Sequence, residues 1–170
     1  TLVGIGVLVV GLIAGTILFS QGTGVFSPRA TPQTTPKNIR VTNVTDSTFT
    51  ISFLTDAATK SFVKYGETEA EMSKQALDDR VQLSADNTLS FTLHHITVRG
   101  LTADKEYTYV IGSGGAEFDN EGKPFTVKTA MNAGGPPAAR TINGVVLNEN
   151  SSPAVNSVVY VSLPNSGEMS

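Results

Sequence analysis

The sequence contains no cysteine. This absence excludes disulfide bonds and thiolate chemistry. If the protein is extracellular, its fold must therefore be stable through packing alone. Basic residues are also few, because 12 Lys and Arg stand against 15 Asp and Glu and leave a net charge of -3. Such a chain has no positive field for holding phosphate groups. We therefore expect no nucleic-acid partner.

Histidine is nearly absent, and the two that occur, His94 and His95, are adjacent. Neighbouring residues of a strand point to opposite faces, so these imidazoles cannot bind one metal ion together. We expect a structural role for both, with one side chain facing solvent and the other at the sheet surface. The sequence therefore predicts no metal site.

The chain lacks the common sequence signatures of catalysis. No serine lies in a G-x-S-x-G context, and no glycine-rich loop joins a strand to a helix to hold phosphate, since Gly112–Gly115 precedes Ala-Glu-Phe and is expected to be a loop. Residues 119–122 are interpreted as a polar turn, not a calcium loop, and residues 78–80 as solvated loop residues. We predict that the protein is not an enzyme and binds no cofactor.

The chain does contain a long apolar stretch, residues 2–19, which carries no charged residue. As an α-helix rising about 1.5 Å per residue, this stretch would span roughly 27 Å, close to the roughly 30 Å hydrocarbon core of a bilayer. We expect residues 1–20 to form a long apolar α-helix that lies in a membrane or in a filament core. Only Thr1 precedes the stretch, and we expect a processing cut at this point.

Three glycines of this stretch fall on one side of the expected helix. Gly4, Gly11 and Gly15 are seven and four residues apart, which places them on one face at about 100° per residue. Gly11-Leu-Ile-Ala-Gly15 matches the small-xxx-small pattern that lets helix backbones approach closely. The stripe predicts self-association into a homopolymer. The alternative is a lone membrane anchor, because glycine is common in transmembrane helices.

This design of a processed apolar N-terminal helix resembles type IV pilins and archaeal pilins over about the first twenty residues. Bacterial type IV pilins usually carry Glu at the fifth mature position, where this chain has Ile5. The departure disfavours a bacterial pilin and leaves archaeal-type pilins and other prepilin-like surface proteins open. The resemblance implies a filament subunit.

Residues 21–36 are rich in Pro and Thr and are expected to be a linker. From 37 to 130 the chain alternates apolar and polar residues in short runs, which is typical of half-buried strands. Seven runs separated by turn signals predict a mainly β, immunoglobulin-like sandwich. The stretch 67–77 is interpreted as a short helical turn or loop, and a turn is expected at 55–57. The expected strands are 39–44, 49–53, 62–65, 81–83, 89–98, 107–111 and 125–129.

Four parts of this region, 36–41, 47–53, 62–66 and 99–109, resemble a fibronectin type III domain. Leu101 and Tyr107 match the family's Leu before the turn and its tyrosine corner, in which the hydroxyl caps nearby backbone. Phe53 stands where the family usually has Trp. The His94-His95 pair also resembles the small N-terminal sandwich domain of purple acid phosphatases. Both resemblances imply a β-sandwich, and the fibronectin type III resemblance implies that Phe53, Leu101 and Tyr107 belong to its core.

After a linker at 131–140, residues 141–170 resemble the opening strands of a carboxypeptidase-regulatory-like sandwich. Two strands cannot bury an adequate core alone. Either the natural chain continues beyond Ser170 or another subunit completes the sheet, and we favour continuation.

These features together predict a cell-surface, extracellular protein that is membrane-inserted through its N-terminal helix before assembly. The leading hypothesis is a pilin-like filament subunit whose helices bundle in the core while sandwiches are displayed outside for adhesion or interaction, with an unknown surface ligand. The alternative is a single-pass surface protein whose sandwiches act as spacers or adhesion modules. An accessory domain of a truncated enzyme is the third hypothesis.

Overall fold

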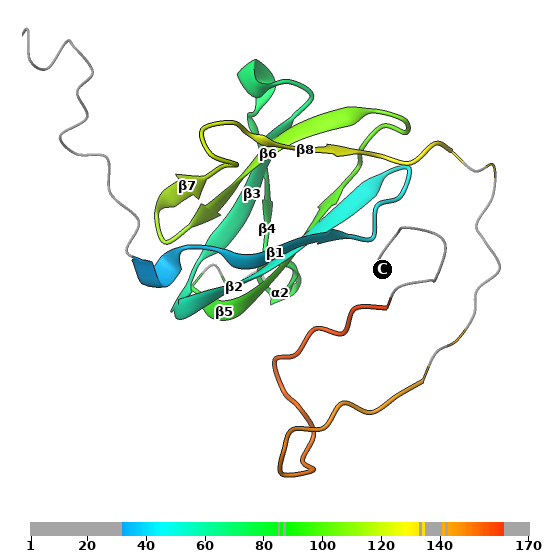
Figure 1. Cartoon of the computed structure of the whole chain (residues 1–170). Helices are drawn as coiled ribbons and strands as arrows, with labels where there is room; N and C mark the ends of the chain where they lie inside the picture. The colour runs from blue at the N-terminus through cyan, green and yellow to red at the C-terminus, as the bar shows by residue number, and fades with distance from the viewer. Residues whose placement is uncertain are drawn as a thin grey trace, which may run out of the picture.

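The computed structural model describes residues 32–84, 86, 88–132, 134, 141 and 143–161. Two antiparallel sheets face one another and form a β-sandwich (Figure 1). The mainly β fold with few helices is thereby confirmed. The apolar stretch 1–20, on which a long helix was predicted, lies outside the described residues.

One sheet has three strands in the order β1-β2-β5, and the other has five strands, of which β4-β3-β6 are followed by β7 and β8 along the same edge of β6. Each strand pairs with a neighbour that is antiparallel to it. The strands are β1 (Lys37–Thr42), β2 (Thr48–Thr59), β3 (Ser61–Gly66), β4 (Lys74–Leu77), β5 (Phe91–Arg99), β6 (Glu106–Ser113), β7 (Ala116–Phe118) and β8 (Phe125–Lys128).

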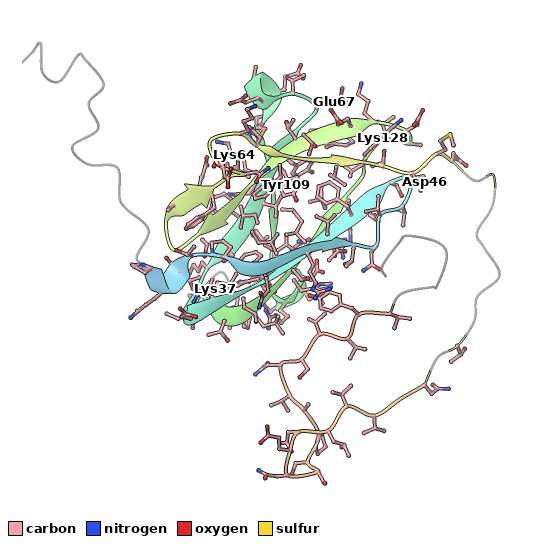
Figure 2. All side chains as sticks on the ribbon, viewed as in Figure 1. Lys37, Asp46, Lys64, Glu67, Tyr109 and Lys128 are labelled. Carbon is pink, nitrogen blue, oxygen red and sulfur yellow. The ribbon has the colours of Figure 1, made fainter. Side chains whose placement is uncertain are left out.

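The core lies between the sheets because alternate residues of the long strands point inward. Tyr109 lies inside the sandwich, whereas Lys37 and Lys128 lie on its outside (Figure 2). Tyr109 packs against Phe49 and Phe125 with ring centroids 5.7 and 5.2 Å apart. The remaining buried members of the cluster are Ile51, Phe53, Val63, Tyr65, Ile96, Val98, Tyr107 and Ile111.

Two predicted elements between β3 and β5 are corrected. Residues 81–83, predicted as a strand, belong to the short helix α2 (Asp79–Ser84). Residues 67–77 contain the expected short helical turn as the 3-10 helix η2 (Glu69–Glu71), but Lys74–Leu77 form strand β4 and not a loop. The polar start of β4 concealed it, since Lys74 and Gln75 are exposed and carry no alternating apolar signal.

The C-terminal boundaries of two strands, β2 and β6, also differ from prediction. The turn expected at 55–57 is absent, because β2 continues to Thr59 through an irregularity in its pairing with β5 between Leu54 and Thr59. Gly112, predicted in a loop, lies within β6, and only Gly114 and Gly115 form the turn to β7, both with positive φ angles. A glycine pair tolerates these φ angles without steric cost.

Both flanks of the sandwich touch it. Pro32–Thr34, at the end of the predicted linker, form the 3-10 helix η1, and the Ser113 hydroxyl donates a hydrogen bond to the carbonyl oxygen of Thr34 at 2.7 Å. On the other side, residues 143–161 contain no strand, although 141–170 was predicted to open a second sandwich. These residues have only an isolated bridge between Leu147 and Pro153 and run as a loop below the sandwich (Figure 1).

Candidate functional site

A cluster of hydrogen-bonded polar side chains lies where α2 meets β5. We call it the Asp–His cluster. Asp78 begins it as the N-cap of α2, since its carbonyl oxygen accepts the backbone N–H of Gln82 at 3.0 Å and its carboxylate accepts that of Arg80 at 3.1 Å. The members of the cluster are Asp78, Asp79, Arg80, His94, His95, Thr97 and Arg99.

Asp78 is buried, with 1% of its surface exposed, yet its carboxylate is fully bonded. Arg80 donates two hydrogen bonds to it at 2.9 and 3.0 Å, and the backbone N–H of His95 donates a further one at 3.1 Å. Burial raises the pKa of Asp78, but the hydrogen bonds from Arg80 and His95 outweigh it and hold the pKa below the ordinary value. Arg80 also stacks over the Phe91 ring, 3.5 Å from its centroid.

Asp79 bonds the next part of β5. Its carboxylate accepts hydrogen bonds from the ring Nδ1 of His95 at 2.9 Å, from the hydroxyl of Thr97 at 2.7 Å and from the backbone N–H of Thr97 at 3.3 Å. Arg99 donates a fourth bond at 3.0 Å. Burial acts to raise the pKa of Asp79, whereas these donors lower it well below its usual range.

These contacts place two carboxylates along the free edge of the three-stranded sheet. β5 is its last strand, so backbone N–H groups on the side away from β2 have no strand partner. Asp78 and Asp79 accept from two of them, those of His95 and Thr97. Charged side chains that cover an edge prevent it from pairing with another chain. Residues 78–80 are thus the cap of this edge and of α2, which corrects their interpretation as solvated loop residues.

The geometry of the cluster does not fit nucleophilic catalysis. A hydroxyl nucleophile must give its proton to a neighbouring base, usually an imidazole. Here Thr97 donates to Asp79, and His95 bonds the same carboxylate, so hydroxyl and imidazole both bond the carboxylate instead of each other. The described residues also hold no group of three His, Asp or Glu side chains placed to bind one metal ion.

The two histidines lie on opposite faces of β5, but their environments differ from prediction. His95 is part-buried in the cluster on the outer face. His94 is completely buried, stacked on Phe53 with ring centroids 4.6 Å apart, and is therefore a core residue and not a surface one. Its Nε2 bonds the Thr55 hydroxyl at 3.1 Å, whereas its Nδ1 has no hydrogen-bond partner and lies 4.0 Å from Asp78.

Burial lowers the pKa of His94 to about 4, since the charged imidazole would lose its hydration, and the negative charge of Asp78 only partly opposes this. The imidazole is therefore neutral at pH 7. A signal for this position was present in the sequence, because His94 alternates with Ile96 and Val98, which are apolar and point inward.

A separate apolar cavity of about 470 Å³ opens between β4 and the start of β5. Phe62, Leu77, Leu89 and Phe91 line it together with Val81 of α2. The described lining carries one buried carboxylate, Asp78, which is already bonded to Arg80. No metal-ligand set converges on this cavity in the described residues.

The predicted core residues occupy the sandwich interior. Phe53 is 1% and Tyr107 3% exposed, and Leu101 packs against the core cluster. The hydroxyl of Tyr107 accepts a hydrogen bond from the backbone N–H of Thr102 at 3.0 Å, as in a tyrosine corner. The helix-packing residues Gly4, Gly11 and Gly15 lie outside the described residues.

The turn at residues 119–122 is closed by its own atoms. The carboxylate of Asp119 accepts a hydrogen bond from the backbone N–H of Gly122 at 2.9 Å, and Glu121 and Gly122 have positive φ angles.

Within the described ranges, no helix is both long and apolar enough to cross a membrane.

Comparison with known proteins gives one family. Residues 36–129 match the family model described as the purple acid phosphatase, N-terminal domain. No curated protein matches the chain. A solved structure described as a computer-based redesign of a β-sandwich protein shares 20% sequence identity over 57% of this chain and 95% of that one, with a TM-score of 0.39.

Proposed function

We propose that this chain, which belongs to the purple acid phosphatase N-terminal domain family, is a structural subunit of a cell-surface filament. Residues 1–20 of many copies would bundle in the filament core, and the β-sandwich would be displayed outside for adhesion or interaction. The observation that carries the proposal is the charge-free stretch 2–19 with its glycine stripe, joined to a folded sandwich by a Pro/Thr-rich linker.

The contacts of the sandwich support a display role. The Asp–His cluster covers the free edge of β5, because both of its carboxylates accept hydrogen bonds from the backbone of that strand. An edge closed in this way keeps neighbouring sandwiches from pairing strand to strand. Many copies could then crowd around one filament core without forming an extended sheet.

Within this proposal the sandwich is of the fibronectin type III kind. The support is the corner formed by Tyr107 and Thr102 and the separation of the strands into β1-β2-β5 and β4-β3-β6. The fold alone does not define a ligand, since the same sandwich serves many roles.

The test is a double variant of the glycine stripe. Gly11→Leu plus Gly15→Leu adds bulk where helix backbones should approach, so surface filaments seen by electron microscopy should be lost or altered. The matched control is Gly6→Leu, because Gly6 falls on the opposite face of the helix at about 100° per residue and should tolerate leucine. Circular dichroism of each purified variant should show an unchanged β-sandwich signal.

Two results would contradict part or all of this proposal. Normal filaments from the double variant would contradict packing through the glycines. A wild-type chain found only as membrane-dispersed monomers would favour a single-pass surface protein that uses the sandwich as a spacer or adhesion module. The family match favours a third candidate, an accessory sandwich of a longer phosphatase, and phosphatase activity that co-purifies with the natural full-length product would support it.

A further inference from the structure

A segment of the chain lies across the outer face of the three-stranded sheet. We call residues Ala154–Val161 the strap. The hydroxyl of Tyr160 lies 2.5 Å from that of Ser52 on β2, and the guanidinium of Arg40 on β1 lies 4.8 Å from the centre of the Tyr160 ring. Val158 and Tyr160 are half-buried, whereas Val159 between them is 60% exposed. One side of an extended strap therefore faces the sheet.

The sheet face beneath the strap is deeply covered at its centre. Ser52 has no exposed surface although it points outward, away from the core. Around the strap the face remains hollow, with a cavity of about 490 Å³ lined by Arg40, Leu54 and Tyr160 and others. The contact thus consists mainly of the Tyr160 ring, which lies over a groove with both polar and apolar lining. Such a small interface could form equally well with the strap of another chain.

The strap reaches this face through a long connection. Residues 131–153 join it to the end of the sandwich and could extend to roughly 75 Å at about 3.3 Å per residue. Several aliphatic side chains of the connection and strap stay in solvent when the strap folds back on its own sandwich. Val145, Val155 and Val159 are 79%, 81% and 60% exposed.

We propose that the outer face of β1-β2-β5 is a docking surface for the strap of a second copy of this chain. Exchange of the strap between copies keeps the Tyr160 contacts with Ser52 and Arg40 unchanged, so it costs little beyond chain entropy. The inference rests on the proposed self-association, which holds neighbouring sandwiches at a high effective concentration.

A photo-crosslinking experiment on the full chain tests this exchange. Tyr160 is replaced by p-benzoylphenylalanine in an unlabelled chain, which is co-assembled with ¹⁵N-labelled wild-type chain, irradiated and digested with trypsin. Exchange predicts crosslinks from the strap to the ¹⁵N-labelled tryptic peptide 41–60, which contains Ser52. Two controls accompany it. The probe at Val159, which points to solvent, should give at least several-fold fewer such crosslinks, and Ser52→Ala in the labelled chain should reduce them.

Electron microscopy of the same sample separates this inference from the proposed function. Filaments in which the probe reacts only with unlabelled peptide 41–60 would overturn exchange and leave the filament proposal intact. Crosslinks to labelled peptide without filaments would support exchange and contradict the filament. Equal labelled crosslinking from positions 159 and 160 would also overturn it, because the contact would then lack the orientation that Tyr160 requires.

Discussion

The imidazole of His94 stacks on the ring of Phe53 at a centroid distance of 4.6 Å, inside the core and with no exposed surface. A neutral ring fits this place, since one nitrogen bonds Thr55 and the other is buried without a hydrogen-bond partner. A protonated ring would carry a buried charge there.

Acid should therefore destabilise the protein through His94. Its pKa is about 4 in the folded state against 6.5 for an ordinary histidine, so between these values the unfolded chain binds more protons and the free energy of unfolding falls as pH falls. From pH 7 to pH 5 this group should cost about 2 kcal/mol. Urea unfolding at both pH values measures the loss. His94→Leu should flatten this slope; an equal slope in the two proteins would contradict the assignment.

Tyr107 should contribute to stability through both its ring and its hydroxyl. Tyr107→Ala removes a buried aromatic ring and is expected to cost about 3 to 5 kcal/mol. Tyr107→Phe keeps the ring but removes the acceptor for the Thr102 N–H, and should cost about 1 kcal/mol. Denaturant unfolding of both variants provides the measurement, and a cost below about 1 kcal/mol for the alanine variant would show that the corner is not structural.

The edge cap predicts a local change in backbone opening. Asp79→Asn weakens the acceptor of the Thr97 N–H, and Asp78→Asn that of the His95 N–H, so each amide should exchange hydrogen faster, with a stability loss of about 1 to 3 kcal/mol. Asp56→Asn is the control, because its ion pair with Lys37 is exposed and is worth about 0 to 1 kcal/mol. Both cluster carboxyls have pKa values lowered from 3.8, so their contribution is present above that pH and is lost below it.

Gly66 should not tolerate a side chain. A Cβ at this position would lie 2.7 Å from the backbone nitrogen of Met72, which follows η2 and cannot move like a flexible side chain. Gly66→Ala is expected to lower the free energy of unfolding by about 1 to 3 kcal/mol. Gly144→Ala meets no atom within 4 Å and should change it by less than about 0.5 kcal/mol. Equal melting temperatures for both variants would contradict the close approach.

The sandwich was predictable where strands alternate clearly. Phe49-Thr-Ile-Ser-Phe53 and Tyr107-Thr-Tyr-Val-Ile111 have an inward face that can be read directly, and both belong to the core. The prediction failed where the pattern is short or polar. Val81-Gln-Leu83 fits a strand and one turn of a helix equally well. The helix forms because Asp78 caps its N-terminus by accepting the backbone N–H of Arg80.

By itself the sequence determined the β-sandwich, its absence of disulfides and the apolar stretch ahead of it, because these follow from periodicity and composition, which are local properties. Only the tertiary structure decided what Asp78, Asp79 and His94 do. Their partners on β2 and β5 lie about 15 or more residues away in the chain. Whether the two carboxylates cap a strand edge depends on which backbone N–H groups the fold leaves without a partner, and the hydrogen bond of His94 depends on the Thr55 hydroxyl that the fold brings to it.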